Sequence, residues 1–191
     1  MAAHVKGAVL KARLDYVEKF FGEAGCSRLF ASLSPDARAA IEHGVLISSW
    51  YPVLLYVEIL VAIDRLFGKG DLELCRVMGN YSARVGLSSV YESFGKQRDA
   101  HFANRMTPIL WKQYYDTGEM QAEAVGEGKA IVRVRDFPEP HRALCLGTLG
   151  WLEAANEIWG VQGAQVNEEK CQALGDPQCE FVVARKGRKT S

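Results

Sequence analysis

The stretch Met120-Gln121-Ala122-Glu123-Ala124-Val125, continued after Gly126-Glu127-Gly128 by Ala130-Ile131-Val132-Arg133-Val134-Arg135, decides the fold class. Side chains alternate in character along both halves, and the glycines between them favour a tight turn, so the stretch predicts a β-hairpin. The region before it shows the longer period of helices instead. The hydrophobic period therefore changes near Gly118, and strands gather at the C-terminal end of a helical chain.

Upstream of this hairpin, apolar residues recur at helical spacing in five segments. The expected helices cover approximately residues 9–21, 35–43, 51–67, 71–85 and 96–115. Downstream, a helix over residues 141–159 precedes two strands over residues 164–173 and 179–184, joined by a Gly-Asp-Pro turn. This order, helices followed by ββαββ, predicts an α+β fold in which N-terminal helices pack on a C-terminal antiparallel sheet.

Length and charge narrow the class of protein. The chain of 191 residues is long enough for one domain, which we expect over residues 1–185, ahead of a disordered basic tail at 186–191. Lys plus Arg and Asp plus Glu both number 23, which argues against a nucleic acid partner. The longest apolar run, residues 51–57, is too short to span a membrane, and no secretory signal pattern begins the chain. We therefore expect a cytoplasmic protein whose thiols stay reduced.

Four late residues, Cys145, Glu168, Cys171 and Cys179, are candidate metal ligands. Thiolates and a carboxylate suit a borderline-soft ion such as zinc, and four protein ligands would close a tetrahedral, structural site. A turn centred near Gly175 would place Cys171 opposite Cys179, with Cβ atoms about 4.5–5.5 Å apart. Glu168 needs a bulge to join them, because three steps along a regular strand reverse the face. Buried core cysteines and a Cys171–Cys179 disulfide are alternative interpretations, and the residues alone leave all three open.

Segments 143–153 and 168–181 resemble the 4-vinyl-reductase domain of bacterial sensory proteins. The glycine-aspartate turn followed by Cys179-Glu180-Phe181 is the most recognisable part of this resemblance. The same ligand-binding superfamily, named for nitric oxide signalling and Golgi transport, includes subunits of the TRAPP vesicle-tethering complex. The resemblance implies a twisted antiparallel sheet covered by helices, often in a dimer, with zinc as the cofactor. By motif position the zinc ligands would be Cys145, Glu168, Cys171 and Cys179.

An aromatic-rich helical region supplies the candidate ligand-binding residues Trp50, Tyr56, His101, Phe102 and Trp111. One interpretation is a well-packed core with tyrosines at its rim. The other is a mostly apolar pocket with a few polar groups, which requires a cavity of at least about 300 Å³. The phenol specificity of known sensors is not transferred, because the spacing of His101 and Trp111 does not match theirs.

The sequence contains no evident nucleophile–base pair, phosphate-binding glycine loop or open metal site, so we expect a non-enzymatic protein. The principal hypothesis is a stand-alone zinc-stapled sensory domain that binds a small hydrophobic molecule. It would signal to an unidentified protein partner through protein–protein contact, as a homodimer formed by its N-terminal helices. The alternative is a TRAPP-like adaptor that has no small-molecule ligand and whose core is filled by side chains.

Overall fold

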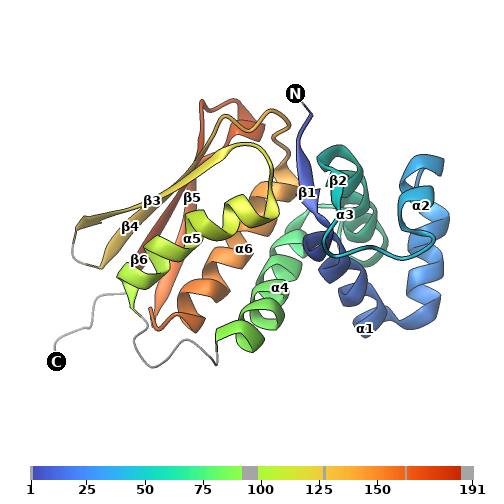
Figure 1. The fold of residues 1–191 in the computed structure, drawn as a ribbon, viewed down its shortest axis with the longest axis horizontal. Helices are drawn as coiled ribbons and strands as arrows, with labels where there is room; N and C mark the ends of the chain where they lie inside the picture. Colours follow the sequence, from blue (N-terminus) through green and yellow to red (C-terminus); the bar gives the residue numbers. More distant parts are fainter. Residues whose placement is uncertain (1, 92–98, 127, 162, 186–191) are drawn as a thin grey trace.

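The computed structural model describes residues 2–91, 99–126, 128–161 and 163–185. Along these residues the chain forms an α+β fold, which confirms the predicted class (Figure 1). The elements are β1 (His4–Lys6), α1 (Gly7–Ser32), α2 (Pro35–Ile41), β2 (Trp50–Pro52), α3 (Val53–Phe67), α4 (Glu73–Tyr91), α5 (Ala100–Tyr114), β3 (Glu119–Gly126), β4 (Lys129–Arg135), α6 (Arg142–Ile158), β5 (Ala164–Lys170), a 3-10 turn (Gln172–Leu174) and β6 (Cys179–Arg185).

The larger sheet is antiparallel, with its strands in the spatial order β3-β4-β6-β5. Val132 of β4 is paired with Phe181 of β6, and both side chains are buried on the helix-covered face. One step along, the paired residues Arg133 and Glu180 turn to the opposite face and form an ion pair of 3.1 Å. This alternation is the period of two that the hairpin sequence shows. The sheet therefore has one core face and one polar face.

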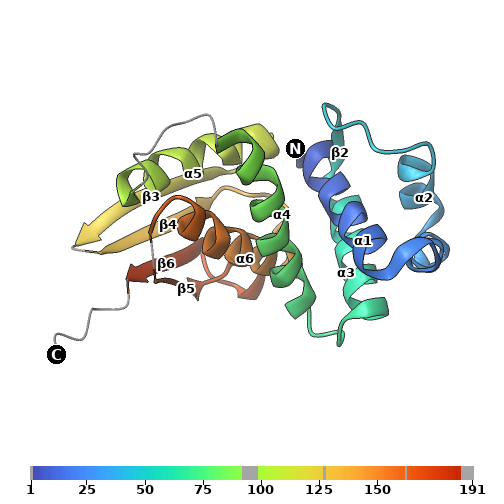
Figure 2. The same ribbon diagram turned by 90° about the horizontal axis from the view of Figure 1, so that it is seen from below.

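Helix α4 packs against α6 at close range, and separates it from the N-terminal helices α1 and α3 (Figure 2). A Cβ atom on Gly150 of α6 would lie 1.9 Å from the carbonyl oxygen of Arg76 on α4. Only glycine permits such an approach of two helix backbones. The layers of the molecule are thus the sheet, then α5 and α6, then α4, and then the N-terminal helices (Figures 1 and 2).

A two-stranded sheet near the N-terminus was not predicted. Strand β1 pairs with β2 in antiparallel fashion, with Val5 opposite Tyr51. Helix α3 therefore begins at Val53, two residues later than expected. Strands of three residues carry too little alternation to be recognised, and their pairing depends on contacts distant in sequence. Helix α1 also extends beyond the expected end, and a positive φ of 63° marks a kink at Gly22.

Most other helix boundaries lie close to the expected ones, but α4 continues to Tyr91, six residues beyond its expected end at residue 85. Ser34 caps α2 through its side chain, with Pro35 in the first helical position. The expected start of the fifth helix, over residues 96–98, lies outside the described residues, and the described helix starts at Ala100. The tail at 186–191 lies outside them as well, whereas Arg185 belongs to β6. None of the helices in the described ranges has both the length and the apolar character needed to cross a bilayer.

Candidate ligand pocket and cysteine cluster

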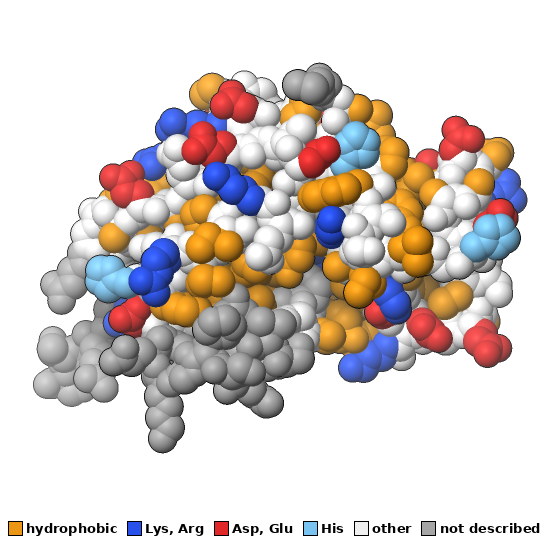
Figure 3. Space-filling model, in the orientation of Figure 1, with side chains coloured by type: hydrophobic (Ala, Val, Ile, Leu, Met, Phe, Trp, Pro, Cys, Tyr) orange, Lys and Arg blue, Asp and Glu red, His pale blue; other side chains and the backbone are white. Residues whose placement is uncertain are grey.

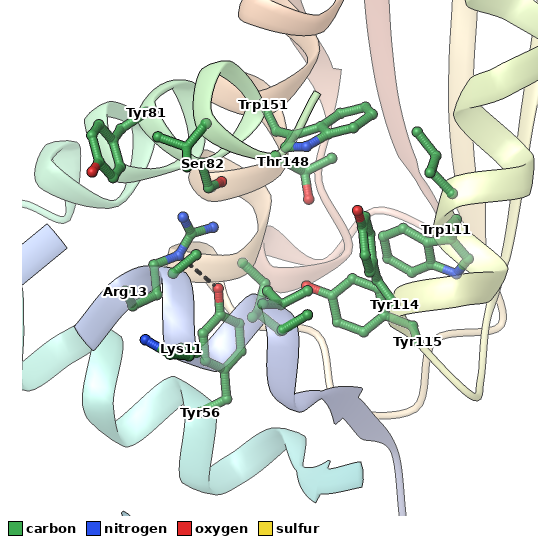
Figure 4. A pocket seen from close by; sticks show the side chains of 18 of the residues that line it. Lys11, Arg13, Tyr56, Tyr81, Ser82, Trp111, Tyr114, Tyr115, Thr148 and Trp151 are labelled. Carbon is green, nitrogen blue, oxygen red and sulfur yellow. Dashed lines mark hydrogen bonds between the residues drawn. The ribbon is translucent and has the colours of Figure 1, made fainter. Parts of the chain in front are cut away.

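A cavity of about 340 Å³ lies where α1, α3, α4, α5, α6 and β3 meet (Figure 4). Most of its wall is apolar, and the larger apolar side chains are Val9, Ile47, Val85, Leu110, Trp111, Met120, Leu144 and Trp151. Polar lining side chains are Lys11, Arg13, Asp15, Tyr56, Tyr81, Ser82, Thr107, Tyr114, Tyr115 and Thr148. The volume exceeds the lower bound of about 300 Å³ for ligand pockets, so the helix–sheet junction is not filled by side chains.

One side of the cavity is a fixed aromatic wall. Trp111 stacks on Tyr115 with ring centroids 4.3 Å apart, and meets Phe137 edge-on at 5.7 Å. The indole Nε1 of Trp111 donates to the carbonyl oxygen of Thr117 at 3.2 Å. Because these contacts hold the ring on several sides, Trp111 presents a rigid apolar surface to the cavity.

The opposite side carries a buried arginine. Arg13 is 4% exposed, and its Nε donates to the Tyr56 hydroxyl at 2.9 Å (Figure 4). Its Nη1 donates to the carbonyl oxygen of Met78 at 2.6 Å. Burial raises the pKa of Tyr56, an effect that the neighbouring Arg13 opposes. Burial also raises the pKa of Tyr115, so both phenols keep their protons at neutral pH.

The structure separates the five candidate ligand-binding residues. Tyr56 and Trp111 line the cavity, whereas the other three do not. Trp50 belongs to β2, is 42% exposed and has the Lys6 ammonium 4.1 Å above its ring. His101 is exposed in the first turn of α5, and Phe102 packs against Trp159 in a second core cluster. Trp50 and His101 therefore lie at the surface of this fold, and Phe102 contributes to core packing.

Sequence reasoning missed Arg13, which is the only charged side chain in the cavity wall that is almost fully buried, as far as the structure describes the chain. The available signal was its position on the apolar stripe of α1. Arg13 follows Leu10 by three residues and precedes Val17 by four, and both neighbours are buried. A charge at this spacing lies on the core face of the helix and needs a partner there.

The structure brings the four candidate metal ligands together outside the lining of the cavity. One ligand atom from each of Cys145, Glu168, Cys171 and Cys179 lies within 4.8 Å of all the others. The Sγ atoms of Cys145 and Cys179 are 3.7 Å apart, and those of Cys171 and Cys145 are 3.4 Å apart. All five cysteines are free thiols, so the alternative of a Cys171–Cys179 disulfide is wrong.

Glu168 reaches this cluster because β5 contains a register shift between Glu168 and Lys170. Such an irregularity was the condition for Glu168 to face the cysteines. Its Oε2 is paired with Arg142, which also donates to the Sγ of Cys171 at 3.5 Å. Its Oε1 is buried and has no hydrogen-bond partner among the described residues. A buried carboxylate oxygen without a hydrogen-bond donor lowers the stability of the folded protein. The thiols of the three cysteines lie close to the Glu168 carboxylate.

The thiols of the cluster influence one another. Hydrogen bonding from Cys145 lowers the pKa of Cys179 to about 7, and the same contact raises the pKa of Cys145. The backbone N–H of Gln172 also donates to the Cys179 sulfur at 3.4 Å. Among the three thiols of the cluster, the pKa is lowered at Cys179 and raised at Cys145 and Cys171, and the thiolate is the form of cysteine that binds metal ions.

No family model matches the chain, and no curated protein matches it in sequence. Solved structures do match over almost its whole length. An H-NOX protein from S. oneidensis in the Fe(II)NO ligation state has 15% identity and a TM-score of 0.74, covering 95% of this chain and 99% of that one. An unliganded Fe(II) H-NOX mutant from K. algicida has 14% identity and a TM-score of 0.72, with coverages of 96% and 98%.

A third similar structure concerns haem redox potential and porphyrin distortion. It has 14% identity and a TM-score of 0.67, and the match covers 94% of this chain and 99% of that chain. Likeness at this level of identity shows that the chain has the fold of H-NOX domains.

These matches correct the expectation drawn from the sequence resemblance. The prediction of a 4-vinyl-reductase or TRAPP-like relative is wrong, because the matching structures are H-NOX domains. The prediction of zinc as the cofactor is wrong as well, because those structures hold Fe(II) and one concerns haem. The resemblance depended on a short turn motif, whose glycine and aspartate are favoured by turn geometry itself.

The residues of the cavity do not fit haem. Haem iron in proteins is held by histidine, cysteine thiolate, tyrosine, or methionine together with histidine. No histidine or cysteine is found in the lining, within the part of the chain that is described, and Met120 is the thioether there. Tyr56 and Tyr115 keep their protons because burial raises the pKa of each phenol, which disfavours a tyrosinate ligand. The fold is therefore shared with haem proteins, whereas this lining is not suited to an iron porphyrin.

Proposed function

We propose that this chain is a non-enzymatic sensory domain that binds a small hydrophobic molecule in the cavity between its helices and its sheet. The observation that carries the proposal is the cavity of about 340 Å³ with its mainly apolar wall. Such a wall with a few placed polar groups is typical of small-molecule sites. The same observation argues against an adaptor whose core is filled. The fold supports the proposal, because a similar structure is that of an oxygen-binding H-NOX domain.

Binding of a neutral apolar dye tests this proposal. Phenylnaphthylamine, whose fluorescence rises in apolar surroundings, is expected to bind saturably with one molecule per chain. Ser82 lines the cavity from α4 (Figure 4), so Ser82→Phe fills the space and is expected to weaken binding at least about tenfold. Val77 on the same helix is 51% exposed and outside the lining, so Val77→Phe serves as the matched control.

The two variants decide the outcome together. Weaker binding in Ser82→Phe alone, with both variants melting like the parent protein, supports the cavity as the site. Equal binding by both variants would place the dye elsewhere on the protein. Absence of saturable binding to the parent protein would refute the proposal.

We propose that the signal leaves through protein–protein contact and that the N-terminal helices form a homodimer. Hydrophobic side chains gather across the centre of the face in Figure 3, between the sheet side and the N-terminal helices. Leu46, Ile47 and Leu54 are 68%, 61% and 63% exposed, and they lie close together in the sequence around β2. A contiguous exposed apolar patch is typical of a protein–protein interface. Sedimentation equilibrium is expected to show a dimer that Leu54→Glu dissociates. A monomeric parent protein at micromolar concentration would contradict this part of the proposal.

We also propose that Cys145, Glu168, Cys171 and Cys179 ligate a metal ion. Their ligand atoms lie within 4.8 Å of one another, and the buried Oε1 of Glu168 has no hydrogen-bond partner among the described residues. An ion there would join α6 to the end of β5 and the start of β6. The proposal concerns the ligands and assigns no ion, because thiolate sites accept several metals.

A further inference from the structure

The charge of Arg13 has no counter-ion in the described structure. Arg13 forms no ion pair with any acidic side chain of the described residues, although it is only 4% exposed. Its two hydrogen bonds go to neutral acceptors, the Tyr56 hydroxyl and the Met78 carbonyl. Asp64 is the buried carboxylate of the same core, but its oxygens accept from the backbone N–H groups of Leu72 and Leu74. An uncompensated buried charge is strongly unfavourable, so this site is built for an anion.

The third nitrogen of the guanidinium group faces the cavity. Nη2 of Arg13 has no hydrogen bond to the described residues, and it would lie 4.0 Å from a Cβ atom on Gly147, which lines the cavity. Figure 4 shows the guanidinium group extending toward the space between Ser82 and Thr148. The side chain therefore keeps free N–H donors directed at whatever occupies the cavity.

The other two charged side chains of the lining, Lys11 and Asp15, have opposite charges that cancel. Lys11 and Asp15 form an ion pair of 2.5 Å, and both are more exposed than Arg13. The cavity therefore has a net charge of about plus one, carried by a single guanidinium group. Its other polar contacts are hydroxyl groups, and Figure 4 shows those of Tyr114, Tyr115 and Thr148 pointing toward the middle.

We propose that the ligand of this cavity is an apolar carboxylic acid, bound as its carboxylate, with Arg13 as the anchoring cation. The inference depends on the proposed function of the cavity and names the class of its ligand. One carboxylate neutralises one guanidinium group, and charge-assisted hydrogen bonds between them are strong. A phosphate monoester carries about −1.5 to −2 charges at neutral pH and would leave a charge buried. The aromatic wall around Trp111 receives the apolar body of the ligand.

A matched pair of probes tests the carboxylate directly. Cinnamate and cinnamyl alcohol share the same aromatic body and differ in the presence of a carboxylate. We expect the parent protein to bind cinnamate at least about tenfold more tightly than the alcohol at neutral pH, measured by isothermal titration calorimetry. Arg13→Met removes the cation with little change of volume and is expected to abolish or reverse this preference. Lys11→Met removes the paired cation of the lining and is expected to preserve it.

Failure of this inference is distinguishable from failure of the proposed function. If both probes bind the parent protein equally while phenylnaphthylamine still binds in a Ser82-dependent manner, the cavity is a binding site but not one for carboxylates. Tighter binding of cinnamyl phosphate than of cinnamate would overturn the commitment to a carboxylate. If none of these molecules binds, both proposals fail. Should Arg13→Met not fold, Arg13→Lys replaces it, and a retained preference for cinnamate over the alcohol is then the expected result.

Discussion

A Cβ atom on Gly79 would lie 2.0 Å from the carbonyl oxygen of Gly147, so the backbones of α4 and α6 are in direct contact at this point. Both helices supply walls of the cavity, through Ser82 on α4 and Thr148 on α6. The volume of the cavity therefore depends on how closely these two helices approach each other.

Gly79→Ala is expected to destabilise the protein by about 1–3 kcal/mol, because an added methyl group must push two helix backbones apart. Gly86 lies on the same helix, and no atom lies within 4 Å of a Cβ placed there. Gly86→Ala should therefore stabilise the protein by up to about 1 kcal/mol through helix propensity. Urea unfolding of both variants measures the difference, and equal free energies of unfolding would show that the contact is not rigid.

Cys179→Ser is expected to remove most of the bound metal ion measured per chain by elemental analysis. Loss of one ligand opens the coordination shell of the metal ion, so the end of β5 and the start of β6 are no longer held to α6. Amide hydrogen exchange is then expected to become faster in both strands. Cys26 is half-buried and outside the cluster, so Cys26→Ser is the control that should retain metal. Protein purified without added chelator that contains no stoichiometric metal of any kind would refute the metal site.

The stability of the protein is expected to fall as pH rises above about 10. Burial raises the pKa of Tyr115 and of Tyr56 above the ordinary phenol value of 10.0. The folded state then keeps protons that the unfolded state has lost, so the stabilisation is complete below that pH and declines above it.

For each such phenol the free energy of unfolding decreases by about 1.4 kcal/mol per pH unit above this point. Tyr115→Phe should therefore reduce the slope. Urea unfolding across the alkaline range gives the slope, and phenolate absorbance gives the ionisation. Full ionisation of all tyrosines while the protein is still folded would be inconsistent with the burial of these two.

Ser34→Ala is expected to cost about 1 kcal/mol, because the hydroxyl caps the N-terminus of α2. The Oγ of Ser34 accepts from the backbone N–H of Ala37 at 3.2 Å and donates to the Glu58 carboxylate at 2.9 Å. Glu58 also accepts from the Ser34 backbone N–H at 2.6 Å, which ties α2 to α3. A double-mutant cycle with Glu58→Gln should reveal a coupling energy of at least about 0.5 kcal/mol. Additive effects would mean that the two helices are held independently of this contact.

Local pattern alone was sufficient to predict much of the architecture. The α+β class, the β3–β4 hairpin and α6 follow from hydrophobic periods of two and 3.6 residues, which depend only on residues close in sequence. The meeting of Cys145 with Cys171 and Cys179 also followed, because a helix before a hairpin must pack on it. The β1–β2 pair did not follow, since its two short strands become neighbours only after the intervening helices have folded.

The cavity was decided by tertiary structure. Whether aromatic side chains fill a core or line a cavity depends on the distances between five helices and a strand. These distances cannot be predicted from any local stretch of the sequence. For this reason Tyr56 and Trp111 reach the cavity, while His101, from the same predicted set, remains on the surface. Arg13 acquires its significance in the same way. Its place on an apolar stripe is a property of the sequence, but the lack of a counter-ion beside it becomes visible only when all neighbouring elements are in position.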